Sequence, residues 1–434
     1  MFVRRRCTPE AALKLEGIKA LVVGMEKSGR AAFEFLHVRG SEVTATDLKF
    51  HDISGFRLQD DELFDEDWDL IVPSPGVPLD LPGIERAIAR GVKVMGDLDL
   101  AAPWLQGPIV GITGSNGKTT TTSLVGHIFR SARTPVQVGG NIGTPVIAMT
   151  ATSRKDQWNV LELSSFQLET IREFRADVGV CLNVTQNHLD RHKTFASYAA
   201  AKSNLFRTQQ SGDFAVLNAD DEVCRSFADV TAATVVWFKG RDIAGLMPPE
   251  DVPIPGRHNA ENVMAAAAVA EIAGIPKSAI AAAVKTFKAV EHRLEFVAEI
   301  GGVRFYNDSK ATSVDATMKA LDSFKGRLWV ILGGKDKGSD YTVLRDQLHR
   351  KAHGALLIGA AADIIAPQIE GATIVIHSET INNAVAEAWK RAQPGDTILL
   401  APACASFDQF QSFEHRGRVF KEIVHGLKTN GAAA

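Results

Sequence analysis

The stretch Gly111-Ile-Thr-Gly-Ser-Asn-Gly-Lys-Thr-Thr-Thr-Thr122 decides the fold class, because it joins an apolar strand pattern to a helix through a glycine-rich loop. Residues 109–112 predict a buried strand, and the glycines permit positive φ angles. The free N–H groups at the start of the following helix favour an anion. Such a loop cradles the phosphates of a nucleoside triphosphate, so we expect Lys118 to reach the β and γ phosphates and Thr119 to bind magnesium.

The loop departs from the common P-loop pattern in one respect. The residue five positions before Gly117 is Ile112, and Gly111 stands one place too early. A glycine-rich turn before a helix can be only a tight connection, but Gly-Lys-Thr after a strand favours phosphate binding. A P-loop switch or motor, in which ATP hydrolysis changes the shape of the protein without forming a bond, is one alternative function.

The composition is that of a globular protein with several domains. The chain has 434 residues, of which 45% are hydrophobic and 23% are charged, and its formal net charge is −3. At about 100–200 residues per domain, this length predicts two to four domains, and we expect three. The small net charge argues against a nucleic-acid partner.

No stretch of the sequence predicts membrane insertion or export. The apolar run at residues 264–270 is far shorter than the ~20 residues that span a bilayer, and Glu271 interrupts it. The basic start, residues 1–6, leads into polar sequence and not into the apolar core of a signal peptide. We therefore expect a cytoplasmic protein with no membrane partner. Dispersed cysteines without a C-x-x-C pair are typical of reduced thiols; they are Cys7, Cys181, Cys224 and Cys404.

Alternating strand and helix patterns predict an α/β fold with parallel sheets. Near the amino terminus, residues 20–23, 31–38 and 42–45 form a strand–helix–strand pattern that ends at Asp47. A nicotinamide oxidoreductase is a second alternative, but Gly24-x4-Gly29 lacks the G-x-G-x-x-G pattern that packs a pyrophosphate on a helix. Residues 69–78 form a further strand that runs into a rigid proline–glycine loop, where open α/β sheets bind ligands.

Two more regions of the same kind follow. The first has strand patterns at residues 160–163, 178–182 and 214–217, a connecting loop at 251–256 and an alanine-rich helix at 262–273. The second has strand patterns at 328–332, 355–358, 373–376 and 397–400. We expect a Rossmann-like domain at residues 1–107, a central P-loop ATPase-type domain at 108–291 and a second Rossmann-like domain at 292–434. The last five residues are expected to be disordered.

The spacing from Gly111 to Gly117, together with five later segments in the same order, resembles the Mur ligase family and its relative folylpolyglutamate synthetase. The resemblance runs from about residue 18 to about residue 425. The segments at residues 162–167 and 402–408 resemble the family member that adds D-glutamate. The five segments are Leu161-Glu-Leu-Ser-Ser-Phe-Gln-Leu168, Asn183-Val-Thr-Gln-Asn-His-Leu-Asp190, Gly256-Arg-His-Asn-Ala-Glu-Asn262, Asn307-Asp-Ser-Lys-Ala-Thr312 and Ala401-Pro-Ala-Cys-Ala-Ser-Phe-Asp408.

The resemblance implies an ATP-dependent, amide-forming ligase of peptidoglycan precursor synthesis that joins D-glutamate to UDP-N-acetylmuramoyl-L-alanine. The alanyl carboxylate would first take the γ-phosphoryl group as an acyl phosphate, and the amine would then attack to give a tetrahedral intermediate. Two anions meet in the first step, so the site needs metal ions and lysines. A sister Mur ligase or a folylpolyglutamate-type ligase that adds another amino acid is the third alternative. A complete site within one chain permits a monomer.

The resemblance also assigns site residues. Thr119 and Glu162 are the expected ligands of a first magnesium ion, since both are hard oxygen donors. His188 is expected beside a second magnesium ion, and Lys202 is expected to carry carbon dioxide as a carbamate, which turns a cation into a carboxylate-like metal ligand. Apart from the resemblance, His192 is expected to be an ordinary surface or hydrogen-bonding histidine, because loop histidines are more often of this kind than metal ligands. The catalytic set is Lys118, Glu162, His188, Lys202 and Lys310, and the ATP site adds Gly114, Ser115, Asn116, Gly117, Thr119, Thr120, Asn259, Asn262, Arg293 and Asp308.

The other two substrates are assigned in the same way. Of the two lysines at residues 335 and 337, Lys337 is favoured as a D-glutamate contact, while Lys335 is kept as an alternative contact. ATP bound between two domains would draw them together and keep water from the acyl phosphate. D-glutamate is expected to contact Lys310, Thr312, Lys337, Ser406 and Phe413. The UDP-linked substrate is expected to contact Lys27, Ser28, Asp47, Leu48, Lys49, Ser74, Pro75, Gly76, Asn141 and Gln167.

Overall fold

The computed structural model describes residues 14–254, 256–288 and 290–430, apart from the side chains of Asp190 and of residues 428–430. The basic start with Cys7 and the tail at residues 431–434 lie outside the described residues. The other three cysteines are free and buried. None of the described helices combines the length and the apolar character needed to span a bilayer.

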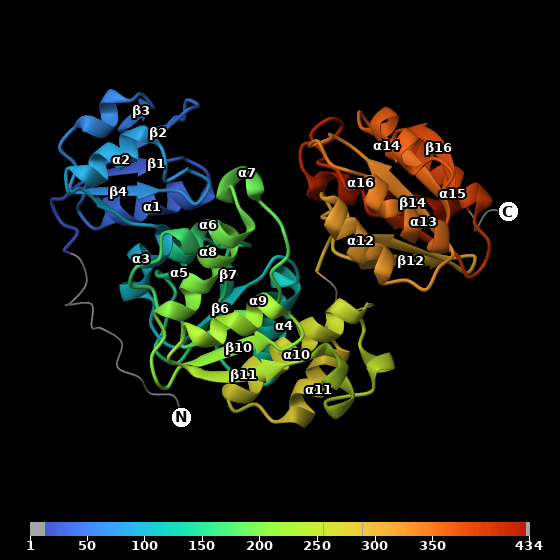
Figure 1. The fold of residues 1–434 in the computed structure, drawn as a ribbon, viewed down its shortest axis with the longest axis horizontal. Helices are drawn as coiled ribbons and strands as arrows, with labels where there is room; N and C mark the ends of the chain where they lie inside the picture. The colour runs from blue at the N-terminus through green and yellow to red at the C-terminus, as the bar shows by residue number, and fades with distance from the viewer. Residues whose placement is uncertain (1–13, 255, 289, 431–434) are drawn as a thin grey trace. The chain divides into compact units, whose positions relative to one another are not determined.

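The first sheet is parallel throughout and has the strand order β3-β2-β1-β4-β5. Its strands are β1 (Lys19–Val23), β2 (Glu42–Asp47), β3 (Phe56–Leu58), β4 (Leu70–Pro73) and β5 (Lys93–Val94). The helices of this region are α1 (Lys27–Val38), α2 (Pro82–Ala89) and α3 (Asp97–Ala101). The strand–helix–strand pattern expected near the amino terminus is β1-α1-β2, and β1 pairs with both β2 and β4 (Figure 1).

The second sheet is also parallel throughout, in the order β11-β10-β9-β6-β8-β7. Its strands are β6 (Ile109–Thr113), β7 (Val136–Gly140), β8 (Trp158–Glu162), β9 (Val178–Cys181), β10 (Phe214–Asn218) and β11 (Thr234–Phe238). The helices are α4 (Lys118–Ser131), α5 (Val146–Met149), α6 (Ser165–Glu169), α7 (Leu189–His192), α8 (Phe195–Arg207), α9 (Glu222–Ser226), α10 (Arg257–Ile272) and α11 (Lys277–Lys285). Every residue of the central strands β6, β8 and β9 is buried, which explains their continuous apolar patterns.

The third sheet has the order β12-β13-β17-β14-β15-β16, and only the pair β12–β13 is antiparallel. Its strands are β12 (Glu295–Ile300), β13 (Val303–Asn307), β14 (Leu328–Gly333), β15 (Ala352–Ile358), β16 (Ile374–Glu379) and β17 (Thr397–Leu400). The helices are α12 (Val314–Asp322), α13 (Arg345–Lys351), α14 (Ala362–Ile369), α15 (Ile381–Arg391) and α16 (Phe413–Asn430).

The chain forms two compact units. One runs up to Met247 and includes Glu261–Val284, and the other consists of Pro248–Ala260 and the residues from Lys285 onward. The first two sheets share the first unit because α1 and α3 both pack on α5, and their apolar side chains form one core cluster. Each sheet falls within one of the three expected domains, while the domain boundaries themselves stay predictions.

The parallel strands bring the predicted site segments to the carboxyl edges of the sheets. In the second sheet β6 lies between β8 and β9, and Ile112 is paired with Glu162. The loop after β6, the end of β8 and the residues after β9 are therefore neighbours. In the third sheet, the segments after β13, β17 and β14 are neighbours in the same way.

Candidate active site

The phosphate loop connects β6 to α4 in a conformation that its glycines make possible. Gly114 has φ 147° and Gly117 has φ 84°, and a Cβ on Gly117 would lie 2.2 Å from Oδ1 of Asn262. The N–H of Ser115 donates to the carbonyl of Asn183 at 2.8 Å, and the N–H of Asn116 donates to Oδ1 of the same residue at 2.9 Å. The loop is thus held on one side by the segment after β9.

Lys118, the first residue of α4, lies against this loop. Its Nζ donates to the carbonyls of Gly114 at 2.8 Å and Ser115 at 3.0 Å. Thr119 and Thr120, the next residues of α4, are buried. The start of α4 therefore combines a helix N-terminus, a lysine and hydroxyl groups, which suits a bound polyphosphate.

Glu162 ends β8 with its side chain buried at 2% exposure. Its Oε1 accepts a hydrogen bond from Nδ2 of Asn141 at 2.9 Å, whereas its Oε2 is buried and has no hydrogen-bond partner among the described residues. A buried carboxylate oxygen without a donor is costly unless a cation meets it. The hard oxygen donors of this edge are of the kind that a magnesium ion prefers, and the metal site itself stays a prediction.

Lys202 is buried under the phosphate loop and is not on an exposed helix face. Its side chain is 1% exposed, and Nζ donates to the carbonyl of Gly114 at 2.9 Å. It also lies 4.5 Å from the centroid of the Tyr198 ring, whose hydroxyl is 3.0 Å from Oγ of Ser115. Burial, with Lys118 nearby, lowers the pKa of Lys202 from the ordinary value of 10.5 to about 7. At neutral pH a large fraction of this amine is therefore uncharged and nucleophilic.

His188 and His192 lie at the two ends of the turn that contains α7. His188 is exposed and has φ 54°, and its ring meets the Phe166 ring at 5.1 Å. His192 is buried, with Nε2 2.9 Å from Oγ of Ser165 and Nδ1 3.0 Å from Oε1 of Glu169. These contacts fit the hydrogen-bonding function expected for His192. The exposed ring of His188 stands where a ligand could reach it.

The residues expected to bind the UDP-linked substrate mostly lie at one edge of the first sheet. Asp47, at the end of β2, accepts hydrogen bonds from the N–H groups of Met25 at 2.6 Å and Lys49 at 3.2 Å. Burial alone would raise the pKa of this carboxyl, but these hydrogen bonds outweigh it and lower the pKa. Ser74, after β4, donates to the carbonyl of Gly24 at 2.6 Å. The same edge carries Lys27, Ser28, Leu48, Lys49, Pro75 and Gly76, of which Leu48 is 78% exposed.

The two remaining residues of that set, Asn141 and Gln167, belong to the second sheet. Asn141 is the residue bonded to Glu162, and Gln167 forms a capping box with Ser164 at the start of α6. Nε2 of Gln167 also donates to Asp97 at 3.0 Å, and burial raises the pKa of Asp97 to about 6. Both amides therefore already hold carboxylates in place, and their contact with the sugar stays a prediction.

The two asparagines expected near the nucleotide base occur on α10. Asn262 is buried, and its Oδ1 accepts a hydrogen bond from the hydroxyl of Thr121 on α4 at 3.2 Å. Asn259 is also buried, but it belongs to the other compact unit. Contacts within one unit thus bring Asn262 to the phosphate loop.

In the third sheet, Asp308 follows β13 and is buried at 6% exposure. Its Oδ1 accepts a hydrogen bond from the N–H of Leu294 at 3.2 Å. Burial raises the pKa of this carboxyl from 3.8 to about 6, although the charge of Arg293 opposes the shift. Arg293 and Asp308 are thus near one another, and their contact with the nucleotide stays a prediction.

The residues expected to hold D-glutamate occupy the loops after β13, β14 and β17 and the first position of α16. Nζ of Lys310 lies 5.7 Å from the centroid of the Phe413 ring, and Ser406 is buried. Lys335 pairs with Ala405 through its backbone. The side chains of Lys335 and Lys337 are both exposed, and the structure leaves the choice between them open.

Sequence reasoning missed Arg416, a completely buried residue of α16. Its guanidinium donates to Oγ of Ser309 at 3.0 Å, to the carbonyl of Ser309 at 2.9 Å and to the carbonyls of Cys404 at 3.2 Å and Ala405 at 3.3 Å. Burial lowers its pKa to about 10, so it stays charged at neutral pH. One cation thus holds together the loops that carry Lys310 and Ser406. An arginine on an otherwise ordinary helix offers no sequence signal for this function.

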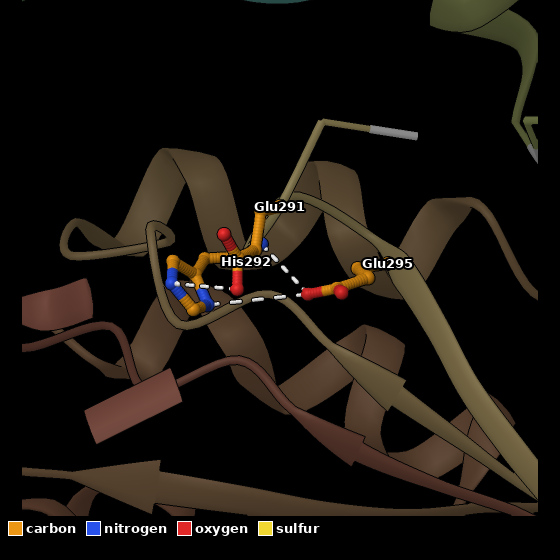
Figure 2. A group of neighbouring side chains, drawn as sticks. All are labelled: Glu291, His292 and Glu295. Atoms are coloured by element: carbon orange, nitrogen blue, oxygen red, sulfur yellow. Dashed lines mark hydrogen bonds and ion pairs between the residues drawn. The ribbon is translucent and has the colours of Figure 1, made fainter. Parts of the chain in front are cut away.

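Figure 2 shows a further group, Glu291, His292 and Glu295, whose ligand atoms lie within 4.8 Å of one another. Nζ of Lys421 pairs with Oε1 of Glu291 at 2.9 Å and with Oε1 of Glu295 at 2.7 Å. The ring of His292 is 2.9 Å from Nδ2 of Asn307, and burial lowers its pKa. One lysine of α16 pairs with both carboxylates and offsets one of their two charges, so the group joins the start of the third sheet to α16.

Comparison with known proteins agrees with this arrangement. Residues 112–245 match the Mur ligase middle domain, and residues 292–404 match the Mur ligase glutamate ligase domain. A UDP-N-acetylmuramoylalanine–D-glutamate ligase of Solibacter usitatus is 60% identical to this chain. The alignment covers 96% of this chain and 99% of that relative. The chain belongs to the Mur ligase family. A relative of the same name from Koribacter versatilis is 48% identical, with 96% of this chain and 99% of the relative covered.

Solved structures of Mur ligases share the fold. A UDP-N-acetylmuramate–alanine ligase from Thermotoga maritima aligns with a TM-score of 0.60 and 17% identity over 94% of this chain and 99% of that protein. A MurF ligase from the same organism, in complex with ADP, aligns with a TM-score of 0.59 and 15% identity over 96% and 97% of the two chains. The predicted α/β fold and the predicted family are both confirmed.

Proposed function

We propose that this Mur ligase joins D-glutamate to UDP-N-acetylmuramoyl-L-alanine with ATP, giving ADP and phosphate, in the cytoplasmic synthesis of peptidoglycan precursors. The observation that carries the proposal is the edge of the second sheet. Two lysines donate there to the carbonyl of Gly114, and the paired strand β8 ends in Glu162, whose buried Oε2 has no hydrogen-bond partner among the described residues. That edge suits a reaction in which two anions must approach each other. The identity of 60% to the Solibacter relative supports the choice of substrates.

In the first step the alanyl carboxylate attacks the γ-phosphorus of ATP, the bond to the β,γ-bridging oxygen breaks, and ADP leaves. Lys118 would exchange the Gly114 and Ser115 carbonyls for phosphate oxygens and so neutralise the charge that develops on the transferred group. Thr119 and Glu162 would hold a magnesium ion, and His188 and Lys202 a second one. These ions would supply positive charge between the phosphates and the carboxylate.

In the second step the amine of D-glutamate attacks the acyl phosphate, a tetrahedral intermediate forms, and phosphate leaves as the amide bond closes. Lys310 and Lys337 would pair with the carboxylates of the amino acid, with Thr312 and Ser406 as hydroxyl partners and Phe413 beside them. Asn259, Asn262, Arg293 and Asp308 would hold the nucleoside of ATP. The edge of the first sheet around Asp47 and Ser74, with Asn141 and Gln167, would hold the UDP-linked donor.

Lys202 is proposed to act as a carbamate. Its neutral amine adds to carbon dioxide, a nitrogen–carbon bond forms and one proton is released, so a cation becomes an anion at the same position. The pKa of about 7 supports this step, because an amine that is partly neutral at cellular pH is a nucleophile. The change would also remove the repulsion between Lys202 and Lys118.

The test is ADP release by the purified protein with magnesium, each UDP-muramoyl precursor and a panel of amino acids. The proposal expects turnover only when UDP-N-acetylmuramoyl-L-alanine and D-glutamate are both present. ADP release with another pair would point to a sister ligase or a folylpolyglutamate-type ligase, and ADP release without either would point to a switch or motor. Intact-mass measurement in bicarbonate, with Lys202→Met as the control, tests the carbamate. Sedimentation of the same sample tests the proposed monomer.

A further inference from the structure

The backbone around α7 does not place His188 by its own preference. α7 has four residues and lies between His188, with φ 54°, and Lys193, with φ 65°. Residues other than glycine rarely adopt this left-handed conformation, and it persists only where surrounding contacts hold it. The contacts of α7 therefore decide where the imidazole of His188 lies.

Arg191 connects α7 to two other segments. Its guanidinium donates to the carbonyl of Val77 at 3.0 Å and to Oε2 of Glu169 at 2.9 Å. It also covers the ring of Phe166, 5.3 Å from the centroid. The side chains of Arg191 and Glu169 are only 13% and 19% exposed, so this ion pair is shielded from water and has a defined geometry.

Phe166 contacts both Arg191 and the two histidines, His188 and His192. Its ring meets His188 edge to face at 5.1 Å and stacks on His192 at 5.6 Å. His192 pairs with the same Glu169 carboxylate, through Oε1 at 3.0 Å. One carboxylate therefore orients both Arg191 and His192, and the Phe166 ring transmits their position to His188.

On the side away from the histidines, Arg191 contacts the loop after β4 through the carbonyl of Val77. The N–H of Val77 donates to the carbonyl of Ser74 at 2.8 Å, and the hydroxyl of Ser74 donates to the carbonyl of Gly24 at 2.6 Å. Residues 74–77 thus form a turn that is fixed to the edge of the first sheet. A ligand that moves or holds this turn also moves or holds the Val77 carbonyl and, with it, Arg191.

We propose that Arg191 is a positioning residue that couples the turn at residues 74–77 to His188. The inference rests on the proposed function, because it takes the turn as the contact of the donor diphosphate and His188 as a group near the reacting carboxylate. With the donor bound, the turn holds Arg191, and Arg191 with Phe166 holds the imidazole of His188. Occupation of the UDP end therefore reinforces the position of the imidazole at the reacting end of the site.

The test compares Arg191→Met and Arg191→Lys with wild type in steady-state assays for all three substrates, and measures binding of UDP-N-acetylmuramoyl-L-alanine by calorimetry without ATP or magnesium. Arg191→Met is expected to raise the KM for the donor and weaken its calorimetric binding by about tenfold, the size expected for one hydrogen bond to a charged group. We expect kcat to fall as well, while the KM for ATP stays within about twofold. Arg191→Lys keeps the charge but not the planar fork, so we expect an intermediate effect.

Lys193→Met is the matched control. Lys193 also reaches the segment after β4, but its pair with Asp80 is 3.6 Å long and 69% and 61% exposed, so its loss should change neither KM nor kcat. Glu169→Gln repeats the test without removing Arg191, and should show the same pattern if Arg191→Met does not fold. Unchanged donor binding in both variants, or an equal rise of the KM for ATP, would overturn the inference. Loss of ADP formation by wild type would instead overturn the proposed function.

Discussion

The substitution Lys202→Met removes a buried charge from the phosphate loop. Lys202 is 1% exposed, and burial, followed by the charge of Lys118, lowers its pKa from 10.5 to about 7. In an unfolded chain the ordinary pKa returns. The ammonium form is therefore disfavoured in the folded protein, and methionine, of similar length and without charge, should relieve this cost.

The sign and size follow from proton linkage. The fall of the pKa from 10.5 to about 7 corresponds to about 5 kcal/mol of destabilisation while Lys202 is charged in both states, that is, below about pH 7. Wild type should therefore be less stable than the variant at pH 6, by up to about 5 kcal/mol. Between about pH 7 and 10.5 the unfolded state of wild type binds more protons than its folded state. The free energy of unfolding of wild type therefore rises with pH relative to that of the variant.

The assay is urea unfolding of wild type and Lys202→Met at several pH values from 6 to 9.5, in buffer freed of carbon dioxide and without nucleotide. We expect the variant to be more stable at pH 6 and the difference to shrink steadily above about pH 7. Thr120→Val controls for a change of packing near the loop without a change of charge. A difference that stays constant over this pH range, or a variant that is less stable at pH 6, would refute the reasoning.

Three further predictions concern single positions. Glu162→Gln keeps the hydrogen bond with Asn141 but removes the negative charge, so magnesium-dependent ADP formation should fall at least about 100-fold. The free energy of unfolding in urea should change by less than about 1 kcal/mol. Retained turnover would contradict a metal-binding function for Glu162. Lys337→Ala should raise the KM for D-glutamate about tenfold and Lys335→Ala much less; equal effects in the kinetic assay count against the assignment. Gly29→Ala places a Cβ 1.8 Å from the oxygen of the Gly24 carbonyl. Thermal unfolding should therefore show a loss of stability of about 2 kcal/mol or more, and calorimetry should show loss of donor binding. A variant with normal melting and binding would be evidence against this close approach.

Much of the fold could be predicted because buried parallel strands have continuous apolar patterns. The strand expected at residues 397–400 is β17, and the helix expected at 262–273 is α10, which begins earlier, at Arg257. The edge strands β7, β11 and β12 were missed. Their residues are half-exposed and alternate less clearly with their neighbours, so they resemble loops in the sequence.

The candidate site was predictable where a motif determines the local backbone, as in the loop from Gly114 to Gly117. It was not predictable where the function depends on distant neighbours. Arg416 occurs on a helix with no motif of its own, and only tertiary packing brings it to the carbonyls of Ser309 and Cys404. The ion pair of Arg191 with Glu169, and its contact with Val77, likewise join segments that the sequence separates widely.

The sequence by itself determined the loop after β6, the parallel α/β architecture and the membership of the Mur ligases, because glycine positions, strand periodicity and short motifs act over a few residues. Tertiary structure alone decided the lowered pKa of Lys202, the lack of a hydrogen-bond partner for Oε2 of Glu162 among the described residues, and the buried position of Arg416. The physical reason is that desolvation and hydrogen-bond partners depend on which side chains surround a group. Those surroundings come from residues far along the chain.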